Sequence, residues 1–207
     1  MRRLTPHDTG AGYDGLAALW DSDAFPRDNG IVAHRRALAF LTPPEGGRHW
    51  RALDVGCGSS GRIIDLLLAE GFTAEGVDVS ARMVDLARHR HPDVMIHLAD
   101  VCAWPLPHRY DFISAWDSIW HVPLPAQEPL LRKLLGALTP GGVCIFTLGG
   151  LDAPQEKTDS AMGPLMYYAT LGIPRTLAVL AETGCVCRHL EYDQLPEPHV
   201  YLIAQRL

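Results

Sequence analysis

One glycine-rich segment constrains the fold of this 207-residue chain more than any other feature. It reads Leu53-Asp54-Val55-Gly56-Cys57-Gly58-Ser59-Ser60-Gly61-Arg62, and it joins an apolar run to a helical one. Glycine is needed where the backbone approaches a ligand closely or takes a positive φ. The start of the following helix offers unpaired N–H groups and a partial positive charge. The segment therefore predicts a strand–loop–helix unit that holds a nucleoside-containing cofactor.

Strand and helix patterns alternate along the middle of the chain. Short apolar runs predict strands at 51–55, 73–77, 94–98, 111–115 and 143–148. Helical spacing, capping residues and Gly or Pro stops predict helices at 62–70, 81–90 and 126–138 between them. This order predicts a doubly wound α/β fold, with helices on both faces of a mostly parallel sheet. Two further runs, 185–192 and 199–206, predict an antiparallel terminal hairpin that completes a seven-stranded sheet.

The length suits one domain, which we divide into four parts. Residues 1–48 form an N-terminal helical cap, with helices at 13–19 and 34–41 and a Pro- and Gly-rich break at 42–47. Residues 49–148 form the cofactor-binding core. Residues 149–172 form a loop-rich insert that acts as a lid, and residues 173–207 form the terminal helix and hairpin.

Charge and hydropathy limit the partners that we expect. The net charge is -6, and the runs of basic residues do not exceed Arg35-Arg36 and Arg132-Lys133, which argues against nucleic acid. No segment reaches the roughly 18 apolar residues of a membrane span. The basic start at residues 1–3 lacks the apolar stretch of a secretory signal. We therefore expect a cytoplasmic protein, monomeric or homodimeric, without a membrane partner.

The five cysteines predict reduced thiols rather than disulfides, because their number is odd and no secretory signal is apparent. Cys185 and Cys187 stand two apart in a predicted strand, so their side chains share a face. No second Cys/His pair stands at zinc spacing. We therefore expect both thiols to be buried and the chain to hold no metal.

The glycines also permit a nicotinamide cofactor. Gly56, Gly58 and Gly61 form G-x-G-x-x-G, and Asp78 follows at nearly the spacing of the dinucleotide fingerprint. A carboxylate at Asp54 argues against this alternative, because it would be buried and would repel a pyrophosphate. A second acid, Asp100, follows the third strand, and little chain remains for a separate substrate domain.

Five segments in order resemble the motifs of class I S-adenosylmethionine-dependent methyltransferases. They are residues 53–58, 77–80, 98–101, 110–116 and 138–142, so the resemblance covers residues 50–148. It implies S-adenosylmethionine as methyl donor, S-adenosylhomocysteine as product, and in-line transfer to a hydroxyl, amine or thiol of a small molecule. The family's third loop glycine would fall at Ser60, one position before Gly61. A protein that binds the cofactor without catalysis remains a second alternative to the enzyme.

The resemblance implies a role for each acid that it aligns. Asp54 would hold the methionine end of the cofactor, and Asp78 would accept both ribose hydroxyls. Asp100 would accept a hydrogen bond from the adenine amino group, beside the N–H of Val101. The other residues predicted to bind the cofactor are Tyr13, Gly56, Cys57, Gly58, Val79, Ala115 and Trp116.

The acceptor should bind where the segment 114–123 leaves the carboxyl end of the sheet. Asp117 and His121, four apart, would face it together if this segment is helical. His121 is a candidate general base, since imidazole titrates near neutrality, and a structural histidine is the alternative. The run after the fourth strand is not Asn/Asp-Pro-Pro-aromatic, which argues against a DNA adenine target. Further acceptor-lining candidates are Trp120, Met162, Met166, Tyr167 and Tyr168, with core packing or a dimer contact as the alternative for the last four.

Overall fold

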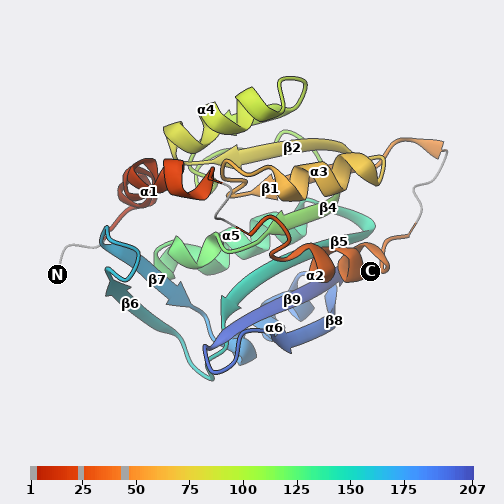
Figure 1. The fold of residues 1–207 in the computed structure, drawn as a ribbon. Helices are drawn as coiled ribbons and strands as arrows, with labels where there is room; N and C mark the ends of the chain where they lie inside the picture. The colour runs from red at the N-terminus through yellow and green to blue at the C-terminus, as the bar shows by residue number, and fades with distance from the viewer. Residues whose placement is uncertain (1–3, 23–25, 43–46) are drawn as a thin grey trace.

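The computed structural model describes residues 4–22, 26–42 and 47–207. Seven strands form one sheet in the order β3-β2-β1-β4-β5-β9-β8 (Figure 1). Neighbouring strands from β3 to β5 run parallel, whereas β9 is antiparallel to both β5 and β8. The fold predicted from the sequence is thus confirmed. The strands are β1 (Arg51–Val55), β2 (Thr73–Asp78), β3 (Met95–Leu98), β4 (Tyr110–Ala115), β5 (Leu138–Gly149), β8 (Cys185–Tyr192) and β9 (His199–Arg206).

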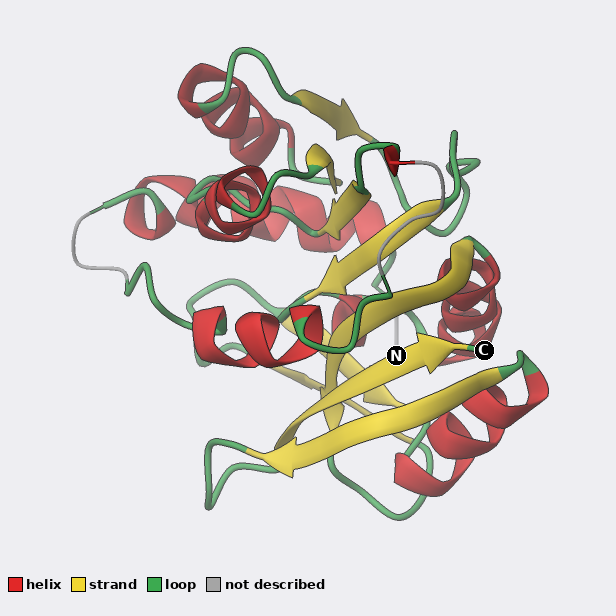
Figure 2. Cartoon of the chain, turned by 90° about the vertical axis from the view of Figure 1, so that its right-hand side faces the viewer, coloured by secondary structure: helices red, strands yellow, loops and turns green. Residues whose placement is uncertain are grey.

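Helices cover both faces of the sheet, as Figure 2 shows. Side chains alternate across a strand, so Ala52 of β1 packs with one group of helices, and Leu53 and Val55 pack with the other. Each buried leucine of these layers contributes roughly 1.5–3 kcal/mol by leaving water. One face carries α2 (Ile31–Leu38), α3 (Arg62–Ala69) and α4 (Ala81–Arg90), and the other carries α5 (Leu124–Gly136) and α6 (Ile173–Glu182).

The first helix, α1 (Pro6–Trp20), begins earlier than the predicted helix at 13–19. Thr5 and Asp8 form a reciprocal capping box: the Thr5 side chain accepts from the Asp8 N–H, and the Asp8 carboxylate accepts from the Thr5 N–H. The helix packs against α4 and against β7 (Met166–Thr170). An added Cβ at Gly10 would lie 2.8 Å from the Val79 carbonyl oxygen, so glycine permits this close approach.

The insert that follows β5 is not the loop-rich segment that we predicted. It contains an antiparallel hairpin of β6 (Gln155–Asp159) and β7, whose register pairs Lys157 with Tyr168. The sequence pattern conceals β6 because its residues are exposed or half-buried and polar, so no apolar alternation marks the strand.

The turn predicted at 139–142 lies inside β5 instead of before it. Tyr110 pairs with Leu138 and Phe112 pairs with Val143, so the residues between them bulge from the pairing with β4. Gly141 has a φ of 76°, the sign that the third position of the predicted type II turn requires. The predicted positive φ is therefore present, but it belongs to a bulge within a longer strand.

Two other expectations concern the cysteines and the chain segments outside the described residues. Cys185 is buried as predicted, but Cys187 is exposed, because β8 is the edge strand of the sheet. Residues 43–46 of the predicted break and the basic start at 1–3 lie outside the described residues. None of the helices in the described ranges combines the length and apolarity that crossing a membrane requires.

Candidate functional site

A cavity opens at the carboxyl ends of β1 and β4, where the strand order of the sheet reverses. In open α/β sheets this reversal is where ligands bind. The cavity contains about 1180 Å³ of space between protein atoms, a volume that includes open solvent. The predicted site residues along its wall are Tyr13, Asp54, Gly56, Cys57, Gly58, Asp78, Val79, Asp100, Val101, Trp116, Asp117 and His121.

The three glycines of the loop serve different purposes. Gly56, Gly58 and Gly61 all have positive φ values, of 70°, 58° and 66°. A Cβ at Gly56 would lie 2.3 Å from the Ser118 Cβ, and a Cβ at Gly61 would lie 2.1 Å from the His91 Cε1. A Cβ at Gly58 would meet nothing within 4 Å. Packing therefore requires the outer two glycines, and Gly58 leaves open space on the wall of the cavity.

Where the family's third loop glycine would fall, this chain has Ser60, and the helix begins after the next residue, Gly61. Ser60 is buried, and its hydroxyl accepts a hydrogen bond of 3.0 Å from the Arg62 guanidinium. Gly61, in the left-handed region, stands at the N-cap of α3. The loop thus reaches the helix one residue later than the resemblance implies.

Asp78 is fixed at the end of β2 by backbone donors. One carboxylate oxygen accepts from the Gly58 N–H at 2.9 Å, and the other accepts from the Ser80 N–H at 2.9 Å. Burial raises the pKa of Asp78, and these hydrogen bonds oppose the rise. An ionised carboxylate has about four acceptor positions, so Asp78 keeps acceptor capacity for a diol in the cavity.

Asp54 and Arg62 are two charged residues of the cavity wall, and their opposite charges attract each other. Burial raises the pKa of Asp54 to about 6, although the Ser114 hydroxyl and the Arg62 guanidinium both favour its ionised form. Arg62 donates to the Asn29 carbonyl oxygen at 2.9 Å, and burial lowers its pKa. Arg62 was not among the residues predicted from the sequence to bind the cofactor. Its position directly after the glycine loop could have identified it, because a cofactor with a carboxylate needs a positive partner.

Asp100 follows β3, and its strand pairs with the one that ends in Asp78, so both acids stand at the same edge of the sheet. The Asp100 carboxylate accepts from the Cys102 N–H at 2.8 Å, which fixes the turn that presents Val101 to the cavity. Ala115, by contrast, is fully buried at the end of β4, and it is not among the described residues that form the cavity wall.

His121 lies between two hydrogen-bond partners. Its Nδ1 is 2.8 Å from the Tyr167 carbonyl oxygen, which can only accept, so Nδ1 carries the hydrogen. Its Nε2 then accepts from the Tyr13 hydroxyl at 2.9 Å. Burial lowers the pKa of His121 to about 4 and raises that of Tyr13. The imidazole is neutral near pH 7, and its role as a general base remains a prediction that requires Tyr13 to move.

Asp117 does not share a helical turn with His121 as we expected. A 3-10 turn, η2, covers only Ile119–His121, and Asp117 takes a φ of 51° outside the helical region. This conformation is held by the Thr147 hydroxyl, which accepts from the Asp117 N–H at 2.8 Å. One Asp117 carboxylate oxygen accepts from His199 Nε2 at 2.9 Å. Asp117 and His121 therefore both line the cavity, but they do not lie on one face of a common helix.

The residues of the insert that were predicted to contact the acceptor have partners within the protein. Met166 is fully buried, and a Cβ at Gly12 of α1 would lie 3.0 Å from its sulfur. The Tyr167 hydroxyl donates to Glu156 at 2.6 Å and accepts from the Leu124 N–H at 2.9 Å. The Tyr168 ring packs against His121, with centroids 4.8 Å apart.

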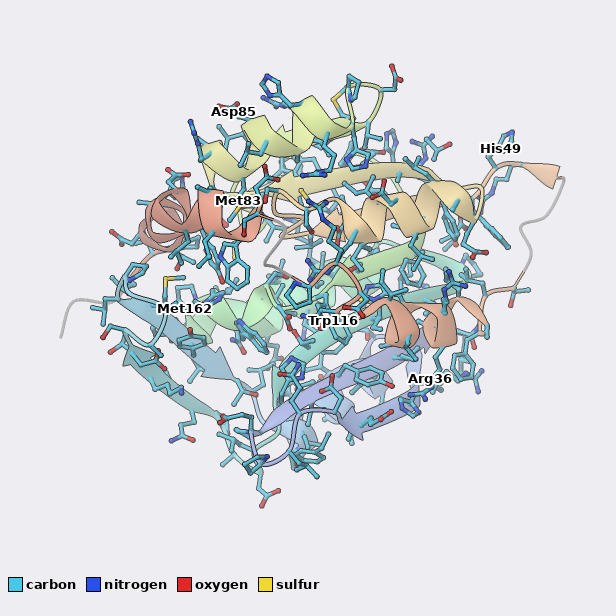
Figure 3. The ribbon with its side chains drawn as sticks, viewed as in Figure 1. Arg36, His49, Met83, Asp85, Trp116 and Met162 are labelled. Carbon is cyan, nitrogen blue, oxygen red and sulfur yellow. The ribbon has the colours of Figure 1, made fainter. Side chains whose placement is uncertain are left out.

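Figure 3 shows Met162 at the end of the β6–β7 hairpin, near α1, and Trp116 near the middle of the molecule. Trp120 packs against His199 and lines a smaller, mostly apolar cavity of about 340 Å³. None of the five further residues predicted to line the acceptor site is among the described residues of the main cavity wall. These are Trp120, Met162, Met166, Tyr167 and Tyr168. Their contact with an acceptor remains a prediction.

The polar groups of the cavity match the groups of S-adenosylmethionine. Three buried polar atoms of its wall, Thr9 Oγ1, Ser59 Oγ and Trp116 Nε1, have no hydrogen-bond partner. An unpaired buried polar atom costs roughly 1–3 kcal/mol, so a polar ligand would relieve this cost. Acidic side chains with one nearby guanidinium suit a ligand that carries a sulfonium, an ammonium, a diol and one carboxylate. Within the described ranges, no group of three or more His, Cys, Asp or Glu side chains is placed to hold a metal ion.

Comparison with known proteins agrees with this geometry. Residues 52–142 match the family described as a methyltransferase domain. The matched segment runs from β1 into the bulge of β5, and it contains the glycine loop, Asp78 at the end of β2 and Asp100 after β3.

Two curated relatives are methyltransferases by name. Trans-aconitate 2-methyltransferase of Methylobacterium radiotolerans is 39% identical over 154 residues, which cover 71% of this chain and 56% of the relative. The 27-O-demethylrifamycin SV methyltransferase of Amycolatopsis mediterranei is 26% identical over 184 residues, which cover 76% of this chain and 66% of the relative. The chain therefore spans between 56% and 66% of the length of these two relatives.

A solved structure shares the fold over the full chain. It is the 1,6-didemethyltoxoflavin-N1-methyltransferase of Burkholderia thailandensis, with bound 1,6-didemethyltoxoflavin and S-adenosylhomocysteine. The TM-score is 0.67 at 20% identity, and the match covers all of this chain and 92% of the other. At this identity the likeness concerns the fold.

Proposed function

We propose that this chain, whose residues 52–142 belong to the class I S-adenosylmethionine-dependent methyltransferase family, transfers a methyl group to a small molecule. One observation carries the proposal. At the switch point of the sheet, the Asp78 carboxylate is held by the N–H groups of Gly58 and Ser80, beside an open glycine. This arrangement would present a half-buried carboxylate to a ligand diol while the backbone lies close to the ligand.

The cavity residues divide the cofactor between them in this proposal. Asp78 would accept from the ribose hydroxyls, and Asp100 and the Val101 N–H would meet the adenine. Arg62 would pair with the methionine carboxylate, and Asp54 would hold the ammonium group. Bound S-adenosylmethionine supplies an electrophilic methyl group on its sulfonium, and the protein supplies the orientation of acceptor and donor.

The N-terminal helix α1 and the β6–β7 hairpin would cover the cofactor and the acceptor. The cap α1, seated on Val79 through Gly10, would cover the cofactor and place Tyr13 over it. The β6–β7 hairpin would act as the lid beside the acceptor, because its strand β7 contacts η2 and α1. The acceptor would be a hydroxyl, amine or thiol compound, methylated in line. We further propose a cytoplasmic monomer or homodimer that needs no metal, nucleic acid or membrane.

Small-molecule acceptors are supported by the relatives, whose names specify trans-aconitate and demethylrifamycin SV as substrates. The negative net charge supports the exclusion of nucleic acid. Both arguments concern the class of acceptor rather than its identity.

Calorimetric titration of the purified chain with S-adenosylhomocysteine and, separately, with NADH tests the cofactor. We expect saturable binding of S-adenosylhomocysteine and none of NADH, because the carboxylates of the cavity would repel a pyrophosphate. Binding of NADH without binding of S-adenosylhomocysteine would instead support an oxidoreductase. Binding of S-adenosylhomocysteine with no turnover on any acceptor panel would support a protein that binds the cofactor without catalysis.

A further inference from the structure

The described wall of the cavity carries more acidic than basic side chains. Asp54, Asp78, Asp100 and Asp117 all lie on its wall, and among the described wall residues Arg62 is the one Lys or Arg. In the proposed function Arg62 is taken up by the cofactor's own carboxylate. A carboxylate acceptor would therefore enter a cavity with an excess of like charge, and a cation would be attracted.

Of these acids, Asp117 belongs to the segment 114–123, which the sequence predicts to contact the acceptor. Its backbone is held with a φ of 51°, a conformation that Asp tolerates better than most residues but seldom adopts without support. The Thr147 hydroxyl accepts from its N–H, and the Asn29 amide donates to its second carboxylate oxygen at 3.3 Å. The side chain remains 28% exposed. The chain thus holds an accessible carboxylate in a fixed position.

His199 orients this carboxylate from behind. Its Nε2 faces Asp117 at 2.9 Å and its Nδ1 faces Asp193, and both carboxylates can only accept while ionised. Both ring nitrogens therefore carry hydrogens. Burial alone would lower the pKa of His199, but the hydrogen bonds to the two aspartates outweigh it and raise the pKa. The imidazolium offsets one of the two negative charges and leaves the other on the trio.

Two aromatic side chains, Trp116 and Tyr13, share the cavity wall with Asp117. The Trp116 ring packs against the His199 ring, with centroids 6.0 Å apart. Aromatic faces beside a carboxylate are suited to a protonated amine, since ring faces attract cations as well as apolar groups.

Resting on the proposed function, we infer that the acceptor carries a protonated amino group anchored by Asp117 near Trp116 and Tyr13. The methyl group then goes to another atom of the molecule that has a free lone pair, because a protonated nitrogen has none. His199, with Asp193 behind it, is a positioning residue for Asp117. A tricarboxylate such as trans-aconitate is then a poor ligand of this chain.

The test compares ligands that differ in one group, using protein saturated with S-adenosylhomocysteine. The probes are phenethylamine, 2-phenylethanol and 3-phenylpropionate, with tryptamine, tryptophol and indole-3-propionate as a second series, and trans-aconitate. Affinities come from calorimetry or ligand-observed NMR. We expect each amine to bind about tenfold or more tighter than its alcohol, the order of a charge-assisted hydrogen bond, and the carboxylates to bind most weakly.

Variants assign the preference to the named residues. Asp117→Asn should bring the amine-to-alcohol affinity ratio to about one, because it keeps the shape and removes the charge. Asp85→Asn, on the exposed face of α4, is the matched control and should keep the ratio (Figure 3). His199→Leu should lower the ratio, and His199→Gln, whose amide still donates to Asp117, should restore much of it. A purely structural role would change both affinities together and leave the ratio unchanged.

Several results would overturn the inference. They are a carboxylate that binds as tightly as its amine, an absence of amine binding in both series, and an amine preference that survives Asp117→Asn. A His199→Leu variant that keeps the full preference would overturn the positioning role. Failure of S-adenosylhomocysteine to bind at the first step would instead contradict the proposed function, so the two failures are distinguishable.

Discussion

Asp78→Ala tests the part of the site on which the cofactor assignment depends. The wild-type carboxylate accepts from two backbone N–H groups and, in the proposed complex, from two ribose hydroxyls. Loss of the two ligand hydrogen bonds should cost roughly 2–4 kcal/mol, since bonds to charged groups are the stronger ones. The dissociation constant for S-adenosylhomocysteine should then rise on the order of 30- to 1000-fold.

The same change affects the apoprotein, and the two effects must be separated. Alanine leaves the N–H groups of Gly58 and Ser80 without their partner, which would cost roughly 1–3 kcal/mol each if both remained dry. Because Asp78 borders an open cavity, water can replace the carboxylate, and we expect the variant to fold with a lowered melting temperature. Asp85→Ala, an exposed aspartate of α4, is the control and should change neither property.

The assay is calorimetry with S-adenosylhomocysteine and with its 2′-deoxyribose analogue. The wild-type protein should prefer the full ribose by about tenfold, the order of one hydrogen bond to a charged group, and Asp78→Ala should show no preference. Unchanged affinity of Asp78→Ala for S-adenosylhomocysteine would refute the ribose assignment. An equal loss for both ligands would show that the mutation acts through the loop rather than through the hydroxyl contact.

Four further predictions concern the lid, the cap, the pH dependence of stability and metals. Tyr168→Ala should change the acceptor KM with cofactor affinity within a few-fold, whereas Tyr167→Ala, which loses a buried ring, should lower the free energy of unfolding by about 3 kcal/mol. Thr5→Ala removes the capping box of α1 and should cost about 1 kcal/mol in a urea titration. Burial lowers the pKa of His34 to about 4, so its contribution to stability is present above its unfolded pKa and is lost as the pH falls towards 4. Urea titrations should show wild type losing about 2 kcal/mol relative to His34→Gln between about pH 7 and pH 5, and equal losses would contradict this. Chelator treatment should leave methyl transfer intact, and restoration of lost activity by added magnesium or zinc would contradict metal independence.

Much of the fold could be predicted because local signals and the overall topology agree. Apolar strands between capped helices determine the doubly wound order, and the glycine loop locates the switch point of the sheet. The start of α1 was also encoded, in Thr5-Pro6 followed by Asp8, but with Asp in place of the usual Glu or Gln of a capping box. The hairpin β6–β7 escaped prediction because one of its strands has no buried face to leave an apolar pattern.

Some residues of the candidate site could likewise be predicted from the sequence, and others could not. Asp54 and Asp78 lie at the ends of β1 and β2, and Asp100 lies just after β3, so the parallel order of these strands brings all three to one edge of the sheet. His199 and Asp193 come from the terminal hairpin, far along the chain from Asp117, and no local motif marks their meeting. Such pairings depend on tertiary packing, which a single sequence does not reveal.

A structure of the chain bound to S-adenosylhomocysteine would show directly whether the cavity residues hold the cofactor. We expect the ribose hydroxyls on the Asp78 carboxylate, the methionine carboxylate at Arg62, and the sulfur directed towards the end of the cavity that contains Asp117. A complex in which the ribose lies away from Asp78, or in which the ligand occupies another part of the molecule, would contradict this expectation.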